Sequence, residues 1–229
     1  MFYLFYRFIR EDRNEIPPDL AVSLLEGFRD LLAIQVELPE LESTESQDIL
    51  REAVTAPSIF DSQLYLYEAA GTLISLLHKT PDQAAALLLS VIRPLLDELS
   101  ASLRAVSGPD DVLAILKVHH IIMALGNIAK GFPEYPNPVP EGYVAPPLEV
   151  FREVGQAILV CLEAMNVFRV VRDAVRCVQW SAVCVLSNVP HPHRHALPSR
   201  GSLPRQDRPL PNSSRRSWRT FSRILSRQS

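Results

Sequence analysis

The sequence has little glycine, few cysteines and none of the short motifs that mark many enzymes. Only 8 of the 229 residues are glycine, and the 3 cysteines form no CxxC pair. No glycine-rich phosphate loop, GxSxG, HExxH or paired His and Cys arrangement is present. We therefore expect no enzyme, with no catalytic, cofactor-binding or metal site and no small-molecule substrate.

Sustained alternation of apolar and polar residues, the pattern of half-buried strands, is also missing. Leucine, alanine and valine are plentiful instead, and apolar side chains recur at helical spacing. With 47% hydrophobic residues, the chain is long enough to bury a sizeable core. These features predict an all-α fold. Cys161, Cys177 and Cys184 lie in helical context, where we expect them to be small apolar core residues of a reducing compartment.

Targeting and membrane signals are weak. The opening MFYLFYRFIRED is apolar, but it has no basic region before it and no cleavage site after it. We interpret it as the exposed end of a helix. Residues 60–77, FDSQLYLYEAAGTLISLL, have the length of a membrane span, but Asp61, Gln63 and Glu68 interrupt them. We therefore expect no membrane insertion.

Charge divides the chain into two parts. Residues 1–180 carry 14 Lys and Arg against 25 Asp and Glu, a net charge of −11. Residues 181–229 carry 9 Arg against one Asp, a net charge of +8, and contain no lysine. This composition argues against a packed core. We therefore predict helical repeats over 1–187 and a basic, disordered tail over 188–229.

The tail has two interpretations. Arginine without lysine, together with serine and proline, is what a GC-rich coding region yields when it is read out of frame. The first interpretation is therefore an out-of-frame or mis-spliced end. The second is a basic amphipathic helix, with Trp218, Phe221 and Leu225 on one face, that binds RNA or a membrane surface.

Helix start and stop signals divide the first part of the chain. Ser58 and Thr80 are expected N-caps, Pro81 and Pro109 suit the first helical turn, and Gly131 suits a helix end. A kink is expected at Pro94. The predicted helical segments are 2–12, 16–34, 46–55, 60–77, 80–108, 109–131, 148–166 and 169–180.

Helix pairs recur at intervals of roughly 40 residues, the period of HEAT-like arrays. Each pair in such a solenoid buries its apolar faces against the pairs before and after it. Residues 60–77 have apolar side chains on more than one face, which predicts an inner helix covered by several neighbours. Ala70 and Gly71 would permit close helix approach. We expect Glu68 to point to the concave rim or to pair with a basic neighbour.

Four stretches, taken in order and spacing, are similar to one known family. They are FDSQLYLYEAAGTLISLL, LLLSVIRPLLDELSASL, HHIIMALGNIAKGF and FREVGQAILVCLEAMNVFRVVRDAVRCVQW. Over residues 1–180 the chain resembles the fungal exportin-T family, whose members are tRNA export receptors of the karyopherin-β superfamily. The resemblance implies a superhelix of HEAT-like hairpins that binds tRNA together with Ran in its GTP state. It also implies passage through the nuclear pore, contacts with nuclear pore proteins, and shuttling between nucleus and cytoplasm.

The chain departs from this family in length. Family members are several times longer, and the N-terminal repeats that grip Ran have no counterpart here, so we expect a fragment or an incomplete gene model. The alternative function is a generic α-solenoid scaffold for protein partners. Such a scaffold would use its concave surface, or would offer the Pro133–Pro147 loop to a domain that reads polyproline II helices.

The arginine row Arg169, Arg172 and Arg176 is the candidate RNA-binding site. Its i, i+3 and i+7 spacing places three guanidinium groups on one helix face, where they could meet phosphate oxygens. A solvated or structurally paired face, with Asp173 and other acidic residues as partners, is the simpler interpretation of the same spacing. His119 and His120 are neighbours on a helix, so we expect one to face the core and the other the surface, with no ligand role.

Overall fold

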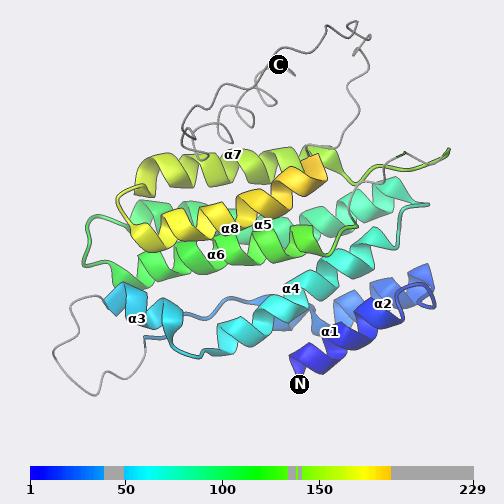
Figure 1. The fold of residues 1–229 in the computed structure, drawn as a ribbon, viewed down its shortest axis with the longest axis horizontal. Coiled ribbons are helices and arrows are strands. Elements are labelled where there is room, and N and C mark those ends of the chain that lie inside the picture. Colours follow the sequence, from blue (N-terminus) through cyan, green and yellow to red (C-terminus); the bar gives the residue numbers. More distant parts are fainter. Residues whose placement is uncertain (39–48, 134–137, 139–140, 187–229) are drawn as a thin grey trace, which may run out of the picture. The chain divides into compact units, whose positions relative to one another are not determined.

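The computed structural model describes residues 1–38, 49–133, 138 and 141–186, with side chains as far as Val178. Within these residues the chain forms eight α-helices and one short 3-10 helix, which confirms the predicted all-α class (Figure 1). The elements are α1 (Phe2–Glu11), α2 (Pro18–Phe28), η1 (Arg29–Leu32), α3 (Ile49–Thr55), α4 (Ile59–Ser75), α5 (Pro81–Ala105), α6 (Val112–Lys130), α7 (Leu148–Met165) and α8 (Arg169–Leu186). The predicted domain boundary and the tail lie outside the described residues and stay predictions.

Local signals in the sequence set several helix starts. Ser58 is the N-cap of α4, and its hydroxyl accepts a hydrogen bond from the Asp61 N–H at 3.3 Å. The Asp61 carboxylate accepts the Ser58 N–H at 2.9 Å, which completes a capping box. Thr80 precedes Pro81 at the start of α5 as predicted, but its side chain makes no cap bond. Pro94 lies within α5 and does not end it.

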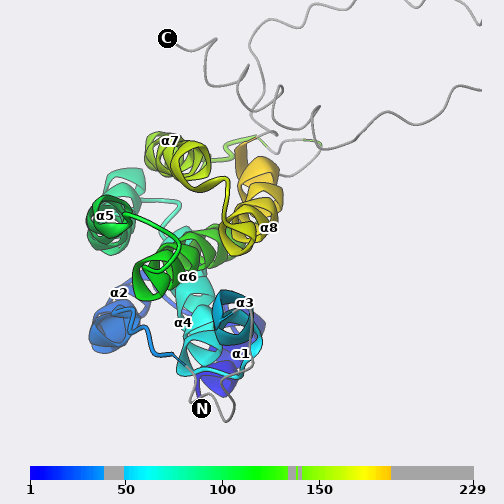
Figure 2. The same cartoon turned by 90° about the vertical axis from the view of Figure 1, so that its left-hand side faces the viewer.

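The helices of residues 1–188 form two layers, and the chain alternates between them (Figure 2). The first layer contains α1, α4, α6 and α8, each packed on the next. The second layer contains α2, α5 and α7, which cover the first layer from one side. The short α3 contacts α6 and α8. This stack of helical hairpins confirms the predicted solenoid.

Helix α4 is covered by several neighbours, which explains its wide apolar surface. It contacts α1, α2, η1, α5 and α6, and Leu66 and Leu73 are fully buried. Two polar side chains of α4 donate hydrogen bonds to the backbone of η1. The Tyr67 hydroxyl donates to the Leu32 carbonyl at 2.6 Å, and the Gln63 amide donates to the Leu31 carbonyl at 3.0 Å. These bonds satisfy backbone carbonyls that the short 3-10 helix leaves without an internal partner.

Glycines allow the closest contacts in the first layer. A Cβ atom on Gly71 would collide with the carbonyl oxygen of Ile128, and one on Gly131 would collide with the backbone of α4. A Cβ atom on Gly126 would lie 2.5 Å from a methyl group of Val178 on α8. Only glycine lacks the side-chain atom that would separate these backbones. The predicted close approach at Gly71 is therefore confirmed.

Glu68 of α4 contacts α1, and its hydrogen-bond partner there is a tyrosine rather than the expected basic residue. The Tyr6 hydroxyl donates to the Glu68 carboxylate at 2.6 Å, and Arg10 donates to the same hydroxyl oxygen at 3.1 Å. Tyr6 is itself buried. Burial and the adjacent Glu68 carboxylate raise the pKa of Tyr6. Arg10 is therefore linked to Glu68 through the Tyr6 hydroxyl, whereas the sequence predicted a basic residue as the direct partner.

The expectation that only one of His119 and His120 faces the core is wrong. Both are buried, at 9% and 5% relative exposure, and their Nδ1 atoms lie 3.1 Å apart. The His120 ring stacks on Phe60 of α4 with ring centroids 3.8 Å apart. Burial lowers the pKa of each histidine to about 4. Because α4, α5 and α8 all pack on α6, two adjacent side chains can both enter the core.

The prediction for the cysteines holds only in part. Cys161 of α7 is buried, as expected. Cys177 of α8 is exposed, because the buried side of that helix is formed by other residues. They are Val171, Ala174, Val175 and Val178. The side chain of Cys184 lies outside the described residues.

Helix α6 is the one described helix that is long and apolar enough to cross a membrane. However, 72% of its most apolar window is buried inside the protein. The neighbours α4, α5 and α8 supply this cover. The composition of α6 therefore reflects its central place in the stack.

Candidate nucleic-acid interface

The structure places the three predicted arginines on α8, away from its buried valines. The side chains of Arg169 and Arg176 are 78% and 66% exposed. Arg172 is half-buried. Arg169 and Arg176 are therefore open to solvent on α8, and an RNA-binding role for the row stays a prediction.

Asp173 lies within this surface and pairs with two of the arginines. One carboxylate oxygen is 3.4 Å from Nε of Arg169, and the other is 3.0 Å from a terminal nitrogen of Arg176. Exposed pairs of this kind are worth at most about 1 kcal/mol each. They still place a negative charge in the middle of the row, where it opposes the approach of a phosphate.

Arg172 has a different partner, which the sequence gave no signal to find. Its guanidinium donates to the main-chain carbonyl of Asn166, at the C-terminal end of α7. Carbonyls at a helix C-terminus carry partial negative charge and favour a cation. This bond orients Arg172 but uses only part of a group that has five N–H donors.

The row is able to contact a polyanion through charge, but it does not form a selective pocket. Its side chains are long, and two of them are largely exposed. Guanidinium groups in such a setting bind phosphate oxygens without reading bases. In the described part of the chain, no three His, Cys, Asp or Glu side chains are grouped so that they could hold a metal ion.

Comparisons with known proteins agree with this fold. The family model of Exportin-T matches residues 1–189, which is most of the chain. The chain belongs to the exportin-T family. This is a family of nuclear export receptors within the karyopherins, so membership also accounts for the hairpin repeats.

The relatives are fungal exportin-T proteins. The chain is 62% identical over 177 residues to Exportin-T of Laccaria bicolor and 52% identical over 178 residues to that of Coprinopsis cinerea. It is 38% identical over 181 residues to that of Mycosarcoma maydis. These matches cover 77%, 77% and 76% of the chain. In each case the chain spans 16% of the relative's length, so it corresponds to a small part of a much longer exportin-T array.

Proposed function

We propose that this chain supplies repeats of a receptor that binds tRNA together with Ran in its GTP state. The receptor would carry tRNA through the nuclear pore, contact nuclear pore proteins, and shuttle between nucleus and cytoplasm. One observation carries this proposal. The Exportin-T family model matches residues 1–189, over the same segment that folds as stacked hairpins.

The arginine row is our candidate for the tRNA contact within this segment. Arg169, Arg172 and Arg176 share one face of α8, and phosphate recognition needs charge and position rather than a deep pocket. Residues 1–180 carry a net charge of −11, so this segment by itself should bind tRNA poorly. The row would therefore act together with other repeats of a longer array.

A chimera tests the proposed function. The matched segment of Laccaria bicolor Exportin-T is replaced by the corresponding residues of this chain, and tRNA binding is measured with and without RanGTP. We expect the chimera to bind tRNA in a RanGTP-dependent manner, because a 62% identical segment should preserve the packing of the array. A folded chimera that has lost this dependence would contradict the proposal.

Two variants of the same chimera test whether the arginine row binds tRNA or is only a surface paired through Asp173. Replacing all three arginines by alanine should weaken tRNA binding and reduce its salt dependence. Asp173→Asn, which removes the countercharge at 3.0 Å from Arg176, should strengthen it. If the row serves only as a paired surface, neither change will alter tRNA binding.

A further inference from the structure

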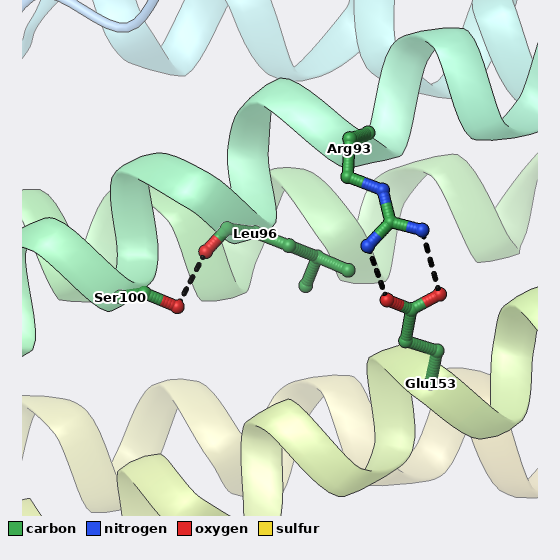
Figure 3. A network of polar contacts seen from close by, with 4 residues as sticks. All are labelled: Arg93, Leu96, Ser100 and Glu153. Carbon is green, nitrogen blue, oxygen red and sulfur yellow. Dashed lines mark hydrogen bonds and ion pairs between the residues drawn. The ribbon is translucent and has the colours of Figure 1, made fainter.

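Helix α5 meets its neighbours in two ways. It packs on α7, where Arg93 forms two hydrogen bonds with Glu153 at 2.6 and 3.4 Å (Figure 3). Beside η1, a groove of about 620 Å³ lies along α5. That volume lies within the usual range of ligand-binding clefts.

The floor of this groove is apolar. Leu32 of η1 and Val91 and Leu95 of α5 are buried beneath it. Ala33 and Ala101 contribute only small side chains, which leaves room above the floor. A partner's apolar side chain placed here would lose contact with water and gain dispersion contacts.

The rim of the groove is mainly acidic. Asp30, Asp97 and Glu98 line it, and Arg29 is its single basic residue. Glu98 is compensated by Lys117 of α6, at 2.6 Å. Asp30 and Asp97 are exposed, and neither has an ion-pair partner among the residues that the structure describes. We call this feature the acid-rimmed groove.

We propose that the acid-rimmed groove binds a basic, amphipathic segment of a partner protein. Apolar side chains of that segment lie over Leu32, Val91 and Leu95, while its lysines or arginines meet Asp30 and Asp97. The charge of the groove selects this occupant. The two exposed carboxylates repel a nucleic acid backbone, and the net charge of −11 over residues 1–180 opposes a second copy of the same surface.

The test uses the full chain and a fluorescein-labelled amphipathic peptide, with lysines on one face and leucine and phenylalanine on the other. Binding is followed by fluorescence anisotropy. The double variant Asp30→Lys/Asp97→Lys should bind the peptide about tenfold or more weakly than the unchanged chain does. The matched control, Asp110→Lys/Glu163→Lys, makes the same change in net charge at exposed positions outside the groove and should alter affinity by less than about twofold.

A second variant probes the floor without changing charge. Ala101→Trp fills the groove and should also abolish peptide binding, while a circular dichroism melt shows whether the variant is folded. Ala101 is exposed, so the larger side chain does not need to enter the core. A folded Ala101→Trp protein that still binds the peptide would exclude the groove as the binding site.

Other occupants give distinct results that would overturn the proposal. Equal binding of a peptide with glutamates in place of lysines would show that the rim does not select charge. Equal losses in the groove variant and its control would show general charge attraction. Sedimentation of the unliganded chain as a dimer that Asp30→Lys/Asp97→Lys dissociates would assign the groove to a second copy. Binding of single-stranded RNA that Ala101→Trp abolishes would assign it to nucleic acid.

Discussion

The helices of the two layers contact one another in different ways. In the first layer, α4 and α6 meet where Gly71 and Gly131 have no side chain, so backbone lies against backbone. In the second layer, α5 and α7 are joined by the partly exposed pair of Arg93 and Glu153, and an open groove lies between η1 and α5. Tight backbone contact tolerates no added atom, whereas exposed side chains can move aside.

This difference suggests a division of roles. The first layer holds the two buried histidines and the glycine contacts, so it should determine whether the segment folds. The second layer borders a groove lined by the exposed carboxylates of Asp30 and Asp97, so it is better suited to receive a partner. Four predictions test the comparison, and the three in the first layer each have a control at a similar residue in a different setting.

The largest effect is expected for Gly71→Ala. The new methyl group would collide with the backbone carbonyl of Ile128, which cannot move without separating α4 from α6. We expect a loss of about 4 kcal/mol or more in the free energy of unfolding, measured by urea denaturation. The control is Gly27→Ala in α2, where nothing lies within 4 Å and the change should stabilise by up to about 1 kcal/mol. Similar values for the two variants would contradict the role of Gly71.

The next effect is a loss of stability in acid from His119 and His120. Burial lowers the pKa of each to about 4 from the ordinary histidine value of 6.5, so the unfolded chain takes up protons first as the pH falls. The stability of the fold is therefore not reduced by these histidines above pH 6.5, and it falls as the pH drops from 6.5 towards 4. For one histidine, this pKa shift corresponds to a loss of about 3 kcal/mol in the free energy of unfolding.

Urea denaturation across that pH range measures this effect. The variant His119→Leu/His120→Phe should flatten the dependence of unfolding free energy on pH between 6.5 and 4. The control His78→Gln changes an exposed histidine and should leave the curve unchanged. An unaltered curve in the double variant would mean that other groups cause the acid sensitivity.

A smaller loss is expected for Tyr6→Phe, which removes the hydroxyl between Glu68 and Arg10. The Glu68 carboxylate is part-buried and would lose its donor, at a cost of about 1 to 2 kcal/mol in thermal or urea unfolding. Tyr65→Phe is the control. Its ring packs near Tyr6, but its hydroxyl has no hydrogen bond among the described contacts. Equal effects of the two substitutions would show that the hydrogen bond to Glu68 adds nothing.

The smallest effect is expected at the second-layer ion pair. Arg93→Ala and Glu153→Ala should each change stability by less than about 1 kcal/mol, because the two side chains are 54% and 39% exposed to solvent. A double-mutant cycle at low and high salt would measure their coupling, which should shrink as salt rises. A coupling free energy as large as the stability loss from Gly71→Ala would show that the second layer depends on specific contacts as strongly as the first.

Much of the fold was predictable because its signals are local. The capping box at Ser58 depends on one side chain and the backbone three residues away, so sequence alone identifies it. Similarly, the i, i+3 and i+7 spacing placed Arg169, Arg172 and Arg176 on one face without knowledge of the neighbours. Family resemblance added what no local signal contains, namely the export receptor class.

The partners of these residues were harder to predict. Asp173 was foreseeable, since it is four residues from Arg169 and three from Arg176. The Asn166 carbonyl that receives Arg172 belongs to another helix, and its position depends on how α7 and α8 meet. Tyr6, the partner of Glu68, is 62 residues away in the sequence.

The sequence by itself determined where helices begin and which of their faces are apolar, because backbone capping and helical spacing act over only a few residues. Tertiary structure decided which helix is covered on several sides, and so why two adjacent histidines of α6 are both buried while Cys177 of α8 is exposed. It also decided that Gly71 tolerates no side chain while Gly27 has open space around it. The physical reason is that burial and steric contact depend on neighbours from distant parts of the chain, and these neighbours are fixed only when the layers pack together.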